Sequence, residues 1–180
     1  NWLKHQTRDD YWKHGSVSVN YDDIQVPVFA LDGYADSYTN SVCTLMEGLS
    51  VPRKAIIGPW AHVFQHDAMD YLGEATKWWD KWLKGIDNDT LDCPQITVWM
   101  EDSMKPETVH PISDGRWVAV ESWPSADVND KTLHMTYGHL QDEKNEKDEI
   151  VDLCTVQNHG LFANEWMGAG VLGESPADMR

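Results

Sequence analysis

Two short apolar runs separated by a helical pattern place the strongest constraint on the fold of this chain. Residues 25–31 and 54–57 are largely apolar and of strand length, without the polar alternation of a half-exposed strand. Between them, residues 40–49 carry apolar side chains at helical spacing. Strand, helix and strand in this order predict two parallel strands with the helix packed on their sheet. The first part of the chain is therefore expected to be an α/β structure.

A longer helix is predicted to follow the second run. Residues 68–83 place an apolar face at helical spacing, and Gly85 stands where a helix terminator is expected. The side chains of that predicted face are Met69, Leu72, Ala75, Trp79, Trp82 and Leu83. A short polar helix is also expected around residues 7–13.

The pattern changes after Gly85. Residues 96–100, 116–120 and 131–137 are strand-like, and turn signals rather than long helices separate them. This change predicts two domains, an α/β part at residues 1–89 and an all-β part at residues 90–180.

Composition argues against several classes of partner. The 180 residues carry a formal net charge of −16, so their surface repels a phosphate backbone and nucleic-acid binding is not expected. The three cysteines form no CxxC pair, which indicates neither a zinc ribbon nor a disulfide framework. No apolar run has the length of a membrane span, so no membrane partner is expected. No secretory leader is recognisable, and a cytoplasmic location is favoured.

An aspartate and a histidine follow the two predicted strands. Asp36 lies in the turn after the first strand and His62 in the turn after the second. In open α/β sheets, ligands bind beyond the carboxyl ends of strands that lie about 4.8 Å apart. We therefore expect the Asp36 carboxylate within about 2.6 to 3.2 Å of the His62 ring. Such a pair suits general-base catalysis, because the imidazole can take a proton from a serine and the carboxylate fixes its tautomer.

These residues also have simpler interpretations. An aspartate after a strand is often a turn residue, which applies to Asp36 and equally to Asp32, although Asp32 could also hydrogen-bond near the site. His62 and His66 could hold a metal ion on a helix, but Pro59 and the missing third ligand argue against this. No metal and no cofactor are therefore expected.

Several strings resemble the serine hydrolases of the CocE/NonD family, which includes cocaine esterase and Xaa-Pro dipeptidyl-peptidases. The similar segments are the end of a helical cap at residues 8–12, a strand and acid turn at 26–38, a histidine turn at 57–62, a helix at 79–85 and the entry to a jelly roll at 117–124. The resemblance covers nearly the whole chain and is strongest between residues 7 and 124.

The resemblance implies a C-terminal piece of such an enzyme. Residues 1–89 would complete an α/β-hydrolase domain, with residues 1–15 ending the helical cap, and residues 90–180 would begin a β jelly roll. Asp36 would be the triad acid and His62 the triad base. Tyr38 would line the acyl pocket, Tyr34 is a further candidate for substrate binding, and Trp60 is either a pocket wall or a core residue.

The family's nucleophilic serine and oxyanion-hole tyrosine have no counterpart in this sequence, which contains no GxSxG string. The resemblance places them upstream, so this chain alone is expected to be inactive.

The implied function is the cleavage of esters or amides through an acyl-enzyme. The substrate would be a small ester, a β-lactam side chain or an Xaa-Pro peptide. The alternative is a non-catalytic jelly-roll module for binding or assembly, and the sequence leaves homo-oligomer formation open.

Overall fold

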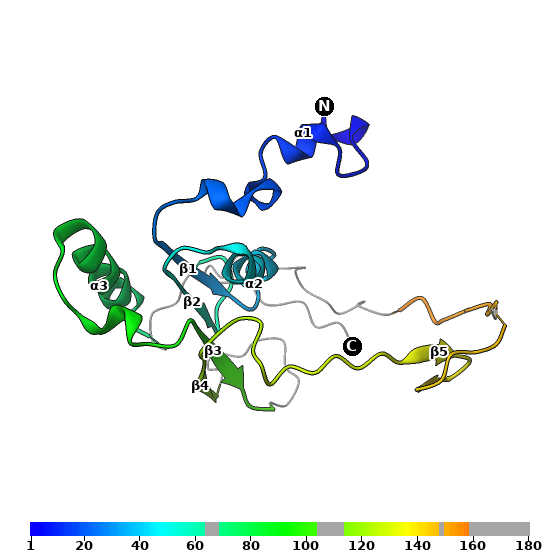
Figure 1. Cartoon of the computed structure of the whole chain (residues 1–180). Coiled ribbons are helices and arrows are strands. Elements are labelled where there is room, and N and C mark those ends of the chain that lie inside the picture. The colour runs from blue at the N-terminus through cyan, green and yellow to red at the C-terminus, as the bar shows by residue number, and fades with distance from the viewer. Residues whose placement is uncertain (64–68, 104–113, 148–149, 159–180) are drawn as a thin grey trace.

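A computed structural model describes residues 1–63, 69–103, 114–147 and 150–158 of the chain. Its centre is a four-stranded sheet in the order β1-β2-β3-β4 (Figure 1). The strands are β1 (Val28–Gly33), β2 (Arg53–Gly58), β3 (Ile96–Glu101) and β4 (Gly115–Val120). β1 and β2 are parallel, which confirms the strand pair predicted from the sequence. β3 continues the sheet parallel to β2, and β4 pairs antiparallel with β3.

The two longer helices, α2 (Thr39–Gly48) and α3 (Tyr71–Lys84), pack on opposite faces of the sheet (Figure 1). Successive side chains of a strand point to opposite faces. In β2, Ala55 and Ile57 belong to the core that contains α2, whereas Lys54 pairs with a carboxylate of α3. The sheet is therefore covered on both faces, as the apolar β1 and β2 runs predict.

The hydrophobic core lies between α2 and the sheet. Val42 and Met46 of α2 are buried there against the strand residues Ala55, Ile57 and Ile96. Gln95 closes this layer, because its amide nitrogen donates to the Met46 carbonyl at 3.3 Å and its amide oxygen accepts from the Trp123 backbone N–H at 3.0 Å. The end of α2 is thereby connected to the start of β3 and to the segment after β4.

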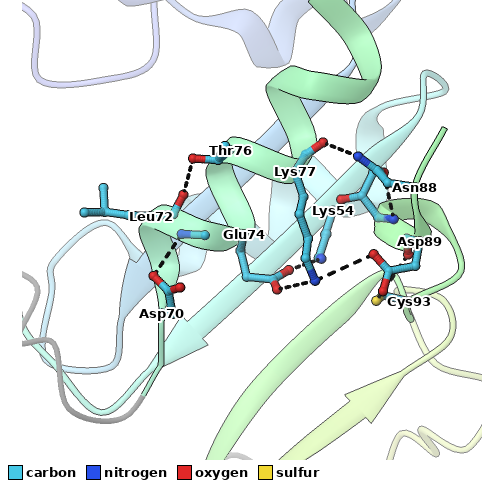
Figure 2. A network of polar contacts seen from close by, with 11 residues as sticks. Lys54, Asp70, Leu72, Glu74, Thr76, Lys77, Asn88, Asp89 and Cys93 are labelled. Carbon is cyan, nitrogen blue, oxygen red and sulfur yellow. Dashed lines mark hydrogen bonds and ion pairs between the residues drawn. The ribbon is translucent and has the colours of Figure 1, made fainter. Parts of the chain in front are cut away.

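On the other face, a polar network joins α3 to β2 and to the turn that follows (Figure 2). The ammonium group of Lys54 lies 2.7 Å from the Glu74 carboxylate, and the Lys54 side chain is only 5% exposed. Lys77 bridges Glu74 and Asp89 at 3.5 and 3.6 Å. A buried ammonium group needs a partner of opposite charge, so this contact fixes how α3 sits on the sheet.

The buried face of α3 differs from the prediction. Trp78 is the buried residue of the helix and packs against Phe29 of β1, whereas Leu72, Trp79 and Leu83 of the predicted face are 64%, 52% and 74% exposed. The helix carries two apolar stripes, and periodicity cannot tell which one faces the sheet. The Lys54–Glu74 pair and Trp78 decide the orientation. The predicted end is confirmed, since Gly85 follows the helix with a φ of 69°.

The β-rich part is only partly as expected. The predicted strands at 96–100 and 116–120 are present as β3 and β4, but they extend the sheet of β1 and β2, so the sheet runs across the proposed boundary between residues 89 and 90. The predicted strand at 131–137 is shortened to β5 (His134–Thr136), which forms a separate hairpin with β6 (His139–Gln141). A jelly roll is not seen in the described residues, and the two-domain division stays a prediction.

The N-terminal segment, which precedes β1, extends away from the sheet (Figure 1). Its helix α1 (Asp10–Lys13) lies within the range of the helix predicted around residues 7–13, and Asp9 is its N-cap. Tyr21 and Ile24 pack against the core and anchor the segment. Single 3₁₀ turns occur at η1 (Trp2–Lys4), η2 (Val17–Val19), η3 (Tyr21–Asp23) and η4 (Asp89–Leu91). No helix in the described ranges is both long and apolar enough to span a bilayer.

Candidate active site

The turn between β1 and α2 holds the Asp36 carboxylate in place. The backbone N–H of Asp36 donates to the Gly33 carbonyl at 3.2 Å, and the Thr39 hydroxyl donates to the carbonyls of Gly33 and Asp36. One carboxylate oxygen of Asp36, Oδ1, accepts the backbone N–H of Tyr38 at 3.0 Å. The second oxygen, Oδ2, is left to face the histidine turn. A side chain held this way loses little freedom when it binds a partner.

Backbone contacts join this turn to the one after β2. The Tyr34 N–H donates to the Gly58 carbonyl at 3.0 Å, and the Ala35 N–H donates to the Trp60 carbonyl at 3.2 Å. Gly33 lies so close to the Trp60 carbonyl and ring that a Cβ would collide with them. The two strand ends therefore place Asp36 and His62 together, as expected at the carboxyl edge of a parallel pair.

The Asp36 carboxylate and the His62 ring form a hydrogen bond of 2.6 Å between Oδ2 and Nδ1. This distance lies at the short end of the range expected from the sequence. The Asp36 side chain is 4% exposed, and the His62 side chain is 66% exposed. In the neutral ring, Nδ1 must carry the proton in order to donate to a carboxylate, so the lone pair is on Nε2. The geometry thus presents a basic nitrogen on an exposed ring.

The surroundings of Asp36 favour its ionised form. Burial alone would raise the pKa of the Asp36 carboxyl, but the hydrogen bonds from the Tyr38 amide and the His62 ring outweigh it, so the pKa lies below its usual value. An ionised partner is what stabilises the imidazolium that forms when Nε2 takes a proton.

A second carboxyl group lies beside this pair. Asp32 is 7% exposed, and its Oδ1 accepts the Gly33 N–H at 2.8 Å, which fits the turn role given by the sequence. Burial raises the pKa of Asp32 against the hydrogen bond from the Gly33 N–H, the negative charge of Asp36 raises it further, and His62 acts in the opposite direction. The acid turn therefore contains two interacting carboxyl groups.

The three aromatic candidates for substrate binding lie in different surroundings. Tyr38 is 62% exposed, with its ring centroid 6.1 Å from that of His62. Tyr34 is 44% exposed. Trp60 is 5% exposed and packs over Gly58, with Trp117 on another side. Of the two interpretations left open for Trp60, the core residue matches its burial.

A cavity of about 560 Å³ opens beside the acid turn on the α2 face. Its polar side is formed by Tyr34, Asp36 and Ser37, and its apolar side includes Ile57, Val98 and Trp123. Cys43 also lines it, and burial raises the pKa of that thiol. Sequence reasoning linked neither Cys43 nor Trp123 to the site, because no local pattern places either side chain beside Asp36.

Thr39 is a further residue that sequence reasoning missed. Its position three residues after Asp36, at the start of the predicted helix, was the available signal. Within the described ranges no three His, Cys, Asp or Glu side chains gather as metal ligands. His66, the partner considered for a metal with His62, lies outside the described residues.

Comparisons with known proteins agree with the resemblance read from the sequence. Residues 1–64 match the family model of the X-Pro dipeptidyl-peptidase (S15 family), a range that includes both turns. No curated protein matches the chain by sequence.

Two crystal structures of a CocE/NonD family hydrolase from Staphylococcus aureus match the fold, each with a TM-score of 0.60. They are 17% and 16% identical in sequence, and each match covers 79% of this chain. The chain spans only 25% of the length of those structures. Residues 1–64 are thus similar to the S15 family model, and the fold of the chain is similar to part of a CocE/NonD family hydrolase.

Proposed function

We propose that this chain supplies the acid and the base of a serine hydrolase that cleaves esters or amides through an acyl-enzyme. The observation that carries the proposal is the 2.6 Å hydrogen bond from His62 Nδ1 to Asp36 Oδ2, on a ring whose remaining nitrogen is exposed. No serine among the described residues is hydrogen-bonded to His62, and the sequence has no GxSxG string. The nucleophile is therefore assigned to a part of the hydrolase outside this chain.

In the proposed reaction, the serine oxygen attacks the carbonyl carbon while His62 Nε2 takes the hydroxyl proton. The tetrahedral intermediate collapses, and His62 gives the proton to the leaving alcohol or amine. Water then attacks the acyl-enzyme, His62 takes a proton from it, and that proton returns to the serine as the acid is released. Asp36 stays ionised throughout and holds the ring with Nε2 toward the reacting atoms.

The substrate class is proposed more broadly than the reaction. Tyr38, exposed beside the His62 ring, is the proposed contact for the acyl group, and Tyr34, which lines the cavity, is a second proposed contact. An ester, a β-lactam side chain and an Xaa-Pro peptide are all compatible with a carbonyl presented between an aromatic wall and the imidazole. The family model at residues 1–64 favours the Xaa-Pro peptide as the first substrate to test.

A fluorophosphonate probe on the complete hydrolase that contains this chain tests the assignment. We expect the probe to label an upstream serine, and we expect His62→Ala to lower both labelling and turnover by about 10³-fold or more. The matched control is His139→Ala, an exposed histidine in the β5–β6 hairpin, which should keep wild-type turnover. Turnover retained in His62→Ala contradicts the proposal and favours a non-catalytic module.

A further inference from the structure

The cavity of about 560 Å³ beside the acid turn has no part in the steps of the proposed reaction. Neither His62 nor Tyr38 is among the described residues that line it, whereas Tyr34 and Asp36 are. The Asp36 side chain is only 4% exposed and binds the His62 ring through Oδ2. In the described structure, the cavity therefore contacts the acid of the proposed pair but not the base.

Two neighbouring strands supply the apolar lining of the cavity. Ile57 of β2 and Val98 of β3 are partners in register, so their side chains lie next to each other on one face of the sheet. Ile57 is 3% exposed and belongs to the core that contains α2. Trp123, from the segment after β4, adds an aromatic side chain to the lining. An aromatic ring can pack against these three side chains.

Uncharged polar groups line the rest of the cavity. They are the phenol of Tyr34, the hydroxyl of Ser37, the side-chain amide of Asn40 and the thiol of Cys43. Burial raises the pKa of the Tyr34 phenol and of the Cys43 thiol, so both groups are uncharged near neutral pH. Within the described residues, the Tyr34 hydroxyl and the Asn40 amide are not engaged in hydrogen bonds, so both are available to a ligand.

The charges around the cavity favour a neutral ligand. No Lys, Arg or His lies among the described lining residues, and the chain has a formal net charge of −16, so an anion is repelled. The Asp36 carboxylate already accepts from the Tyr38 amide and bonds to the His62 ring, so it does not require a cation. The volume lies within the range of about 300 to 1,000 Å³ that is typical of small-molecule sites.

We propose that this cavity binds a neutral aromatic compound of the substituted-phenol type and that the bound compound weakens the hold of Asp36 on His62. The ring packs on Ile57 and Val98, and the hydroxyl donates a hydrogen bond to the Asp36 carboxylate. A carboxylate that accepts a further hydrogen bond stabilises a protonated imidazole less well. The binding site is a property of the chain itself, whereas the regulation of catalysis rests on the proposed function.

Binding is tested on the isotope-labelled chain with para-ethylphenol as the probe. We expect nuclear Overhauser contacts from the probe ring to the methyl groups of Ile57 and Val98, with a Kd of about 1 mM or tighter. Para-ethylbenzoate has a similar shape but carries a negative charge, and it should bind about tenfold more weakly because it approaches Asp36. Absence of the methyl contacts, or equal binding of the two probes, overturns the proposal.

A cavity-filling variant checks the location. Cys43→Phe places a ring inside the cavity and should abolish binding of para-ethylphenol. The matched control is Thr44→Phe, because Thr44 is the next residue of α2, is exposed and is not among the lining residues. Circular dichroism shows whether both variants fold, and the contacts in the wild type decide the site if Cys43→Phe does not. Unchanged binding to a folded Cys43→Phe variant overturns the assigned location.

The regulation is tested in the complete hydrolase. Saturating para-ethylphenol should lower kcat by about threefold or more, the effect of one hydrogen bond, and should leave KM unchanged because the probe does not lie beside His62. A raised KM with unchanged kcat means that the probe competes with the substrate and contradicts a second site. Unchanged kcat and KM contradict the regulation. A hydrolase that is inactive even without the probe disproves the proposed function and leaves the binding measurements to decide the site.

Discussion

Gly33 lies directly against the backbone carbonyl of Trp60, at a distance that leaves no room for a Cβ atom. Gly33 ends β1, and Trp60 stands two residues after the end of β2, so this contact is where the two strand ends meet. Hydrogen bonds on either side of it, from the Tyr34 N–H to the Gly58 carbonyl and from the Ala35 N–H to the Trp60 carbonyl, connect the two turns through their backbones. The short distance between Asp36 and His62 depends on this close approach.

Gly33→Ala is therefore expected to destabilise the chain and to separate the acid from the base. The added methyl group has to push the Trp60 backbone away, and overpacking of this kind costs about 1 to 3 kcal/mol. Urea denaturation measures the loss, and the shift of the His62 ring nitrogens reports the broken contact with Asp36. The control is Gly15→Ala, because nothing lies within 4 Å of a Cβ at Gly15. Equal stability of the two variants would contradict the proposed role of the close approach.

Two neighbouring tryptophans of α3 test which face of the helix is buried. Trp78 is 1% exposed and its ring lies 5.8 Å from that of Phe29, whereas Trp79 is 52% exposed. Trp78→Ala leaves a cavity under the helix and should lower the free energy of unfolding by about 3 to 5 kcal/mol. Trp79→Ala should change it by less than about 1 kcal/mol. Urea denaturation followed by circular dichroism compares them, and the reverse order would restore the face predicted from the sequence.

The fold near β1 and β2 could be predicted because its signals are local. Apolar runs without polar alternation at residues 25–31 and 54–57 predict both strands, and the structure places β1 and β2 over these runs. The orientation of α3 could not be predicted, since it depends on Lys54, a charged residue in a strand that finds Glu74 twenty residues later. The pairing of β3 with β2 could not be read either, because a strand-like run does not say which edge of a sheet it joins.

The candidate site shows the same division. Asp36 and His62 each follow a strand, so their proximity could be expected, and the structure places them 2.6 Å apart. Their catalytic role stays a prediction. The orientation of the Asp36 carboxylate toward His62 could not be derived from spacing, because a turn that points the two side chains apart would have the same sequence separation. The Thr39 hydroxyl and the hydrogen bonds between the turns determine that geometry.

The ion pair between Lys54 and Glu74 gives a third prediction. Glu74→Ala leaves the ammonium group of Lys54, only 5% exposed, without its carboxylate, and loss of one partner of a buried pair costs about 3 kcal/mol or more. Lys54→Met should cost less, since it removes the buried charge and leaves Glu74, 25% exposed, beside Lys77. Urea denaturation gives both values. A surface pair, Lys84 with Asp80, is the control, and Lys84→Ala should cost about 0.5 kcal/mol or less.

Glu74→Ala and Lys54→Met of equal cost would mean that the contact acts by packing alone. A cost in Glu74→Ala as small as that of Lys84→Ala would show that Lys54 reaches water when its partner is removed.

The acid dependence of stability gives the fourth prediction. Hydrogen bonds from the Tyr38 amide and the His62 ring, acting against burial, hold the pKa of Asp36 below its ordinary value of 3.8. Between the two values the unfolded chain binds more protons than the folded one, so stability rises with pH through this window and is lost as pH falls through the folded pKa. Asp36→Asn removes this contribution. Its difference in free energy of unfolding from the wild type should therefore shrink as the pH is lowered.

Two variants separate the causes of that shift. His62→Ala removes a hydrogen bond and a charge from Asp36 and should weaken the acid dependence of the chain clearly. Ser37→Ala removes a longer contact of 3.4 Å and should weaken it less. Urea denaturation from about pH 7 to about pH 3 compares all of them with the wild type. If the curves of Asp36→Asn and the wild type run parallel over this range, the Asp36 carboxyl contributes no acid-dependent stability and its pKa is not lowered by His62.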